Sequence, residues 1–309
     1  MRTRILLTAS ASLAVIICTG LLLFRHIGGY RYDSEVERII NTPQTYGGEI
    51  QDNLVALGPD AAPALGRKLF SDYEFPMTLV MALGTIGDPR GTAPLLEFLD
   101  SYAPHEDKAV GALPTAAIEA LKDIGNPRAC DTLAAIYPVD DGVSQGRLGA
   151  AAAVARICAG TQQADARAYV FARYREMKAD RMAFSMGWDH LVYKALIDVN
   201  TDESNAILID DILKLDNWHY LSMPVIEHMP RVGGEEVIDG LMAIVASPES
   251  RYEMHYRIAA AGALLDLGVD DSPELDARIR ELLDDAVRYE RPESFIADAR
   301  RLVNRIDSR

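Results

Sequence analysis

The sequence predicts an all-α fold, a solenoid of about seven stacked helical hairpins preceded by a single N-terminal transmembrane helix. Two observations predict the solenoid: apolar residues recur at intervals of 29 to 42 residues, and a glycine or asparagine follows nearly all of them. Repeats of this size are supersecondary units that bury their apolar faces only by stacking on one another. The third observation is a run of uncharged residues near the N-terminus, Ile5 to Phe24.

The repeated segment is an amphipathic helix with matched start and stop signals. Its closest copies are Pro76–Arg90 (PMTLVMALGTIGDPR) and Pro114–Arg128 (PTAAIEALKDIGNPR). Proline suits the first helical turn, where no N–H bond is lost, and glycine suits the left-handed position after the last turn. The apolar residues at the helix ends, here called the register residues, are Leu57, Ile86, Ile124, Ile157, Val199, Val232 and Leu267.

Three further positions keep step with the register residues. The residues three places earlier lie one turn back on the same face, and all are apolar: Leu54, Leu83, Leu121, Val154, Leu196, Met229 and Leu264. The residues one place later are Gly58, Gly87, Gly125, Cys158, Asn200, Gly233 and Gly268, so only Cys158 departs. Four places earlier, small residues predict close helix contacts at Ala82, Ala120, Ala153, Ala195 and Ala263, while Asn53 and His228 break the pattern.

A second amphipathic segment follows each of these helices, as at Thr92–Leu99 and Ala206–Leu213, so the unit is a helical hairpin. Through ALGTIGDPR at Ala82–Arg90 and ALKDIGNPR at Ala120–Arg128, the chain resembles the HEAT family in its short bacterial form, like that of the phycobilin lyases. The resemblance covers roughly Ile50 to Leu283. It implies a right-handed α-solenoid whose concave face is lined by the second helices.

The N-terminal run from Ile5 to Phe24 follows two positive charges, Arg2 and Arg4, and is long enough to cross a bilayer. A cleaved signal peptide is the alternative, but no small-residue cleavage site precedes Arg25. A lipoprotein reading through Cys18 is disfavoured by the bulky isoleucine before it. We therefore expect an uncleaved single-pass anchor, with the repeat domain on the periplasmic or extracytoplasmic side.

Four segments follow from these patterns. We assign 1–27 to the anchor, 28–49 to a linker and N-terminal capping helix, 50–290 to the repeat array, and 291–309 to a C-terminal capping helix. The spacing of Ser34 to Glu37 is that of a capping box and predicts the start of the first folded helix. We expect the array to form one extended unit.

The net charge limits the classes of binding partner, and the cysteine content bears on the redox state of the compartment. The net charge of −15, without a basic cluster interleaved with aromatics, argues against nucleic acid and favours a basic partner. Cys130 and Cys158 fall in successive repeats. They form either a disulfide in an oxidising compartment or two buried thiols that act as small apolar residues.

Motifs for catalysis and metal binding are weak. Gly142–Gly146 (GVSQG) fits a nucleophile elbow, but a helix and Pro138 precede it, so we expect Ser144 in a loop near a helix start. The six histidines never pair at helical ligand spacing, and we assign no metal, no cofactor and no catalytic residue. Adjacent carboxylates, as at Asp210 and Asp211, point about 100° apart and are interpreted as a solvated face.

One region departs from the repeat pattern. Trp188 and His190, and Trp218 and His219, open consecutive repeats, and His228 occupies the small-residue position of the second. One hypothesis is an aromatic, partly polar pocket that binds a peptide or a flat ligand. The alternative is that the tryptophans fill space where the helix pairs are irregular.

Function is predicted at the level of class. We favour a non-catalytic, membrane-tethered scaffold that binds a protein or peptide, preferably basic, through its concave face. The resemblance implies an alternative, a phycobilin-lyase-like enzyme or a protein that holds a tetrapyrrole or another flat ligand in the groove. An anchored chain fits a soluble chromophore lyase poorly, and no catalytic motif carries over to this sequence.

Overall fold

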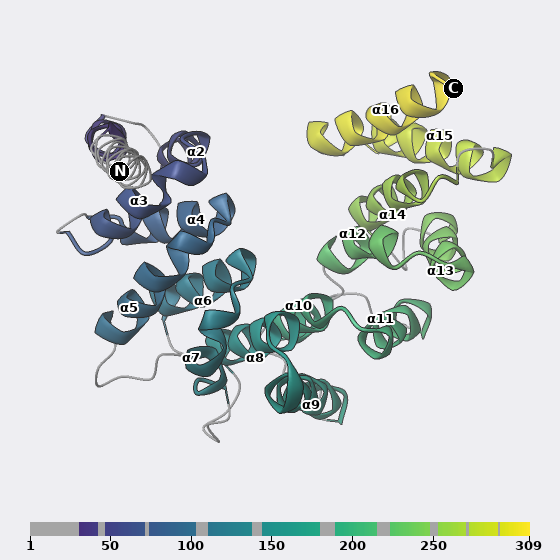
Figure 1. The fold of residues 1–309 in the computed structure, drawn as a ribbon. Coiled ribbons are helices and arrows are strands. Elements are labelled where there is room, and N and C mark those ends of the chain that lie inside the picture. The colour runs from purple at the N-terminus through teal and green to yellow at the C-terminus, as the bar shows by residue number, and fades with distance from the viewer. Residues whose placement is uncertain are drawn as a thin grey trace, which may run out of the picture. The chain divides into compact units, whose positions relative to one another are not determined.

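The computed structural model describes residues 31–42, 47–71, 74–102, 111–137, 144–179, 189–214, 223–247, 253–269, 272–289 and 291–309. Within these ranges all of the regular structure is helical (Figure 1). None of the helices described there is both long enough and apolar enough to cross a membrane. The predicted anchor, Ile5 to Phe24, lies outside the described residues.

The first unit begins with helical residues 31–40 and continues in pairs of helices. The first helices of the pairs are α2 (Gly47–Ala56), α4 (Pro76–Ile86), α6 (Ala112–Ile124) and α8 (Gln145–Ile157). The second helices are α3 (Ala62–Lys68), α5 (Thr92–Tyr102), α7 (Cys130–Ala134) and α9 (Gly160–Ala179). Short 3₁₀ turns, η1 (Pro59–Ala61), η2 (Pro89–Gly91) and η3 (Pro127–Ala129), join the helices of the first three pairs. The first helices pack on one another in a row, and α3, α5 and α7 pack along one side of that row (Figure 1).

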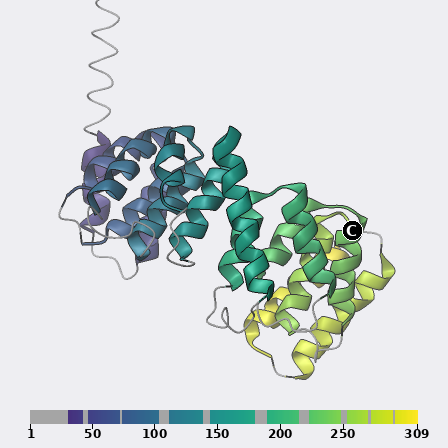
Figure 2. The same cartoon turned by 90° about the horizontal axis from the view of Figure 1, so that it is seen from below.

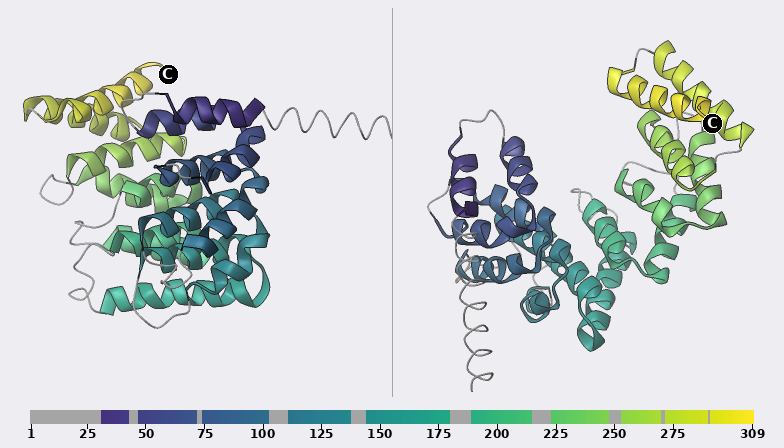
Figure 3. Two further views of the ribbon diagram at one scale, coloured as in Figure 1. Left: turned by 90° about the vertical axis from the view of Figure 1, so that its left-hand side faces the viewer. Right: turned by 45° about the horizontal axis from the view of Figure 1, so that its top comes forward.

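The second unit repeats this arrangement. Its first helices are α10 (Asp189–Val199), α12 (Met223–Val232), α14 (Met254–Asp266) and α16 (Glu293–Asp307), and its second helices are α11 (Asp202–Lys214), α13 (Glu235–Ala246) and α15 (Pro273–Arg288). Among the first helices, α10 packs on α12 and α14 packs on α16. Among the second helices, α11 packs on α13 and α13 packs on α15. The successive layers of each unit can be followed by colour in Figures 2 and 3.

The boundary between the two units falls inside α9, between Ala166 and Arg167. The start of α9 bonds within the first unit, where Gln162 donates to Asp131 at 2.9 Å. Its last turns bond within the second unit, where Lys178 donates to Asp211 at 2.7 Å. One uninterrupted helix therefore supplies packing surface to both units.

The predicted register is confirmed in all seven repeats. Each apolar residue three places before a register residue is at most 1 % exposed. Burial of such a side chain stabilises the fold by about 1.5–3 kcal/mol, so these residues form the core of the stack. Every glycine or asparagine after a register residue has a left-handed φ, from 45° at Asn200 to 77° at Gly268. Cys158, the exception in sequence, is also the exception in structure, with φ −95°.

The predicted close approach of neighbouring first helices is confirmed between α4 and α6. A Cβ added at Gly84 would lie 2.8 Å from the Cα of Ala120, one of the predicted small residues. The other small residues of this set are also buried. His228 is buried at the same position in α12, while Asn53 is exposed.

The N-terminal helical residues 31–40 are fastened to α3 by two ion pairs. Arg67 contacts Asp33 at 2.7 Å and Lys68 contacts Glu37 at 2.9 Å. The helix already includes residues 31–33, so the prediction that Ser34 starts it is wrong. The segment is nevertheless a helix at the edge of the first unit, as we expected of a terminal cap.

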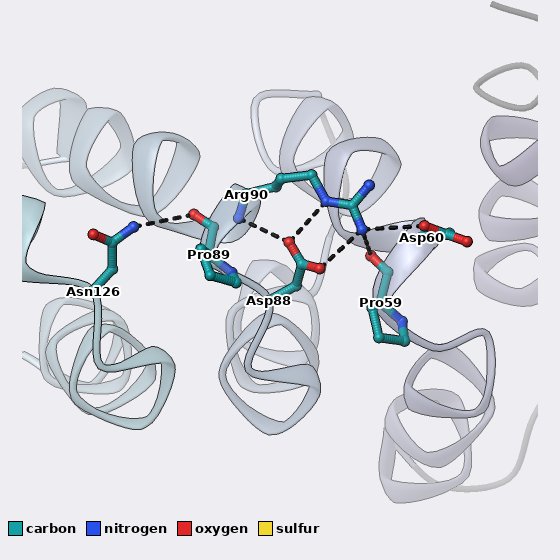
Figure 4. A network of polar contacts seen from close by, with 6 residues as sticks. All are labelled: Pro59, Asp60, Asp88, Pro89, Arg90 and Asn126. Atoms are coloured by element: carbon teal, nitrogen blue, oxygen red, sulfur yellow. Dashed lines mark hydrogen bonds and ion pairs between the residues drawn. The ribbon is translucent and has the colours of Figure 1, made fainter. Parts of the chain in front are cut away.

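A chain of polar contacts joins successive turns of the first unit (Figure 4). The Asp88 carboxylate accepts from the backbone N–H of Arg90 at 2.8 Å and so caps η2. The Arg90 guanidinium reaches the Pro59 carbonyl oxygen of the preceding repeat, and the Asn126 amide of the following repeat donates to the Pro89 carbonyl oxygen at 3.5 Å. The Asp-Pro-Arg and Asn-Pro-Arg sequences therefore link one repeat to the next.

A disulfide joins Cys130 and Cys158, with their Cα atoms 5.8 Å apart. Of the two alternatives left open by the sequence, the structure has the bridge. Cys130 begins α7 and Cys158 follows the last residue of α8. The bridge explains why a cysteine, rather than glycine, ends this first helix.

Candidate binding groove

The structure describes two of the five residues predicted to form an aromatic pocket. Trp188, Trp218 and His219 lie outside the described residues, so for them the pocket stays a prediction. His190 is exposed at the start of α10. His228 is only 4 % exposed, inside the packing of α12.

His228 bonds within the interior of the second unit. Its Nε2 lies 3.3 Å from Oδ1 of Asn205, and the amide of Asn205 donates to Asn200 at 3.3 Å. Its Nδ1 is buried without a hydrogen-bond partner among the described residues. Burial lowers the pKa of His228, and the nearby positive charge of Arg231 lowers it further. The neutral imidazole therefore connects α12 with α11.

Sequence reasoning missed a groove of about 650 Å³ in the second unit, formed by α12, α14 and α16. Its floor is one stripe of α14, made of His255, Ile258, Ala259, Gly262, Ala263 and Asp266. Eleven helical steps separate the first and last of these residues, so the groove runs for about 16 Å along α14. The binding face implied by the resemblance consists of second helices, whereas this groove belongs to first helices.

The floor is low because its central residues are small. A Cβ added at Gly262 would meet only Leu302 of α16, at 3.8 Å. The signal in the sequence is the run from Ala259 to Ala263, which holds only alanine and glycine. Small residues let another chain approach a helix closely, so α14 offers room for a ligand backbone or for side chains.

The walls combine apolar and acidic side chains. Met223, Glu227 and Pro230 line the groove from α12, where spacings of four and three residues place them on one face. Phe295, Asp298, Arg301 and Leu302 line it from α16. The groove therefore offers apolar surface together with hydrogen-bond acceptors.

The two ends of the groove differ in chemistry. At the N-terminal ends of α14 and α16, the rings of His255 and Phe295 stack with centroids 5.9 Å apart. At the C-terminal ends, Arg305 contacts Asp266 at 2.6 Å and donates to the Leu265 carbonyl oxygen at 2.7 Å. Helices α14 and α16 consequently run in the same direction, with an aromatic end and an ionic end between them.

The charges of the groove are only partly balanced. Asp298 pairs with Arg301 and Asp266 pairs with Arg305. Glu227 is exposed, and among the described residues no side chain forms an ion pair or hydrogen bond with it. The unbalanced charge on the walls is therefore negative.

A second polar cluster corrects the prediction for the carboxylate pair on α11. Asp210 is exposed as expected, but Asp211 is only 2 % exposed, so a solvated face is wrong for it. Asp211 accepts from the hydroxyls of Tyr174 and Tyr193, both at 2.8 Å, in addition to Lys178. Burial raises the pKa of Tyr174, and its hydrogen bond to Asp211 raises it further.

The burial of Asp211 could have been predicted from its spacing from other residues of α11. It lies three residues after Leu208 and seven after Ser204, and both of these are fully buried, so all three share one face of α11. Its oxygens are bonded to groups on α9 and α10. This arrangement holds three helices together and leaves no carboxylate oxygen unbonded for chemistry.

The other motifs have structural roles in the described residues. The Ser144 hydroxyl accepts from the backbone N–H of Arg147 at 3.2 Å and caps α8, which confirms the prediction of a helix start. Among the described residues, no three histidine, cysteine or carboxylate side chains gather in a way that would hold a metal ion.

Comparison with known proteins identifies the repeat. The family model of the PBS lyase HEAT-like repeat matches residues 77–101, which span most of α4, all of η2 and nearly all of α5. These residues are therefore a HEAT-like repeat, and the resemblance seen in the sequence is confirmed there. Helix pairs on both sides follow the same register.

Other comparisons add little. None of the curated proteins matches the chain. Among solved structures, human deoxyhypusine hydroxylase in complex with glycerol aligns with 93 % of this chain and 99 % of its own, at 18 % sequence identity and a TM-score of 0.36. A likeness at that level carries no argument about function.

Proposed function

We propose that this protein is a non-catalytic, membrane-tethered HEAT-repeat scaffold that binds a protein or peptide partner in the groove of α12, α14 and α16. The observation that supports the proposal is the groove itself, with its floor of small residues and its apolar and acidic walls. Concave sites that combine apolar surface with a few polar groups are typical binding sites, and helix grooves commonly receive peptide segments.

The proposal places the repeat domain on the extracytoplasmic side of a membrane. Two features support this placement. The run from Ile5 to Phe24 has the length and composition of a membrane span. The Cys130–Cys158 disulfide fits an oxidising compartment, because cytosolic thiols are kept reduced.

A scaffold is also favoured over an enzyme by the roles of the polar groups. Ser144 caps a helix, and every oxygen of Asp211 is bonded to groups that hold helices together. The groove itself is lined by apolar residues, carboxylates and Arg301, with the stacked rings of His255 and Phe295 at one end.

Site-specific photo-crosslinking tests the proposal. A benzophenone amino acid replaces Met223, on the groove wall, in the full-length protein in its native membranes; the control carries it at Val287, which is 52 % exposed on α15. We expect the groove position to crosslink one protein, identified by mass spectrometry, and the control position not to do so. Adding Gly262→Leu, which fills the groove, should abolish that product. The same product from both positions, or its persistence in the filled groove, would contradict the proposal.

A further inference from the structure

We infer that the groove selects a partner segment that places a lysine or arginine against Glu227 and a large apolar side chain against the His255–Phe295 stack. The inference rests on the proposed function and adds the chemistry of the partner. It follows from the charge balance of the walls and from the common direction of the helices.

Glu227 is the acidic residue of the groove that is free to bind an incoming cation. The carboxylates of Asp266 and Asp298 already contact arginines of α16. Among the described residues, none forms an ion pair or a hydrogen bond with Glu227, and its side chain is exposed on the wall of the groove. A cationic partner side chain would gain the contact without displacing an existing ion pair.

Helix direction favours a cation at the same end of the groove. Helices α12, α14 and α16 are successive first helices and run in the same direction, as the paired ends of α14 and α16 confirm. Their C-terminal ends carry the negative ends of their dipoles, which attract cations. Pro230 and Asp266 mark that end of the groove, and Glu227 lies one turn before it on α12.

The opposite end is suited to an apolar anchor. The stacked rings of His255 and Phe295 lie at the start of their helices. In the register, Glu227 of α12 matches Gly262 of α14, and His255 precedes Gly262 by seven residues, which corresponds to about 10 Å along the helix. The partner should therefore carry its apolar and basic side chains about seven residues apart on a helix, or about three residues apart on an extended segment.

A phage-displayed peptide library selected on the full-length protein in lipid nanodiscs tests this inference. The library is applied to the wild type, to Glu227→Arg, to Gly262→Leu, and to the matched control Glu236→Arg, which reverses an exposed charge on α13 outside the groove. We expect wild type and control to enrich peptides with leucine, phenylalanine or methionine at one of the stated spacings from arginine or lysine. The Glu227→Arg protein should enrich peptides with aspartate or glutamate in place of the base.

A selected peptide is then synthesised and its binding is measured by fluorescence anisotropy. The loss of a charge-assisted contact in Glu227→Arg should weaken binding about tenfold or more, while Glu236→Arg should change it less than about twofold. If Gly262→Leu abolishes binding but the charge at position 227 alters neither the selected sequences nor the affinity, the inference fails and the groove function stands. If Gly262→Leu leaves binding unchanged, the groove is not the binding site and both proposals fail.

Discussion

The guanidinium of Arg90 donates a hydrogen bond to the carbonyl oxygen of Pro59, 2.9 Å away and one repeat earlier in the chain (Figure 4). The same nitrogen contacts Asp60 at 3.2 Å. The guanidinium also donates two hydrogen bonds of 2.8 Å to the carboxylate of Asp88. Asp88 thus orients Arg90 toward the preceding repeat. The contact explains what the Asp-Pro-Arg sequence contributes beyond ending a helix.

Replacing Arg90 with alanine should lower the free energy of unfolding by about 1 kcal/mol, because the side chain is 45 % exposed and water replaces much of what is lost. The control is Asp60→Asn, which removes only the exposed ion pair and should cost less than about 0.5 kcal/mol. Urea unfolding followed by circular dichroism measures both. Equal losses in the two variants would show that the bond to the Pro59 carbonyl contributes nothing.

The same substitution should have opposite effects at two glycines. Alanine favours a helix over glycine by about 1 kcal/mol, but at Gly84 the new Cβ would press on the backbone of Ala120. Overpacking costs about 1–3 kcal/mol, so Gly84→Ala should destabilise the protein. At Gly262 the new Cβ would make only an ordinary van der Waals contact with Leu302, so Gly262→Ala should stabilise the protein by up to about 1 kcal/mol. Thermal unfolding of both variants should give shifts of opposite sign, and an increase in both would contradict the close packing of α4 on α6.

Reduction of the Cys130–Cys158 bridge should lower the free energy of unfolding by about 3–4 kcal/mol, the loop-closure value for cysteines 28 residues apart. Urea unfolding with and without a reducing agent measures the effect. The double variant Cys130→Ser, Cys158→Ser should match the reduced protein and should not respond to the reductant. A wild type that is indifferent to reduction would mean that the bond is not formed.

Asp211→Asn should cost about 2–4 kcal/mol, because it leaves Lys178 without its counter-ion and alters two tyrosine bonds. Tyr193→Phe removes one neutral donor and should cost about 1 kcal/mol. The double variant should lose less than the sum of the two, since the side chains share one contact. Urea unfolding of the three variants gives the coupling energy, and simple additivity would argue that Asp211 and Tyr193 do not interact.

His228 should make the second unit sensitive to acid. Burial lowers its pKa in the folded state, so its contribution to stability is present above the unfolded value of about 6.5 and is lost as the pH falls through the folded value. The urea midpoint should therefore drop between pH 7.5 and pH 5.5, by an amount that the non-titrating His228→Gln reduces. His190→Gln, an exposed histidine on α10, is the control and should keep the full drop.

The periodic features of the fold could be predicted because each depends on residues close in sequence. Leu121, Ile124 and Gly125 lie within five residues, and their spacing alone determines which side faces the core and where α6 ends. The same reasoning succeeded for Asn200, whose positive φ follows from its place after the register residue.

The groove could not be predicted in this way. The groove lies between α12 and α16, above the small residues of α14. Its width depends on the distances between three helices, and the hydrophobic periodicity of a single helix does not determine those distances. Met223, Gly262 and Leu302 are separated by about forty residues each, and no local pattern connects them.

The disulfide between α7 and α8 affects how the protein has to be produced. Because the bond needs an oxidant, a cell that produces this polypeptide in a reducing interior would make a chemically different and weaker molecule from one that exports it before folding is complete. Laboratory material from the two routes should differ in mass by two hydrogens and in resistance to proteases. Preparations intended for partner searches therefore have to be checked for free thiols first.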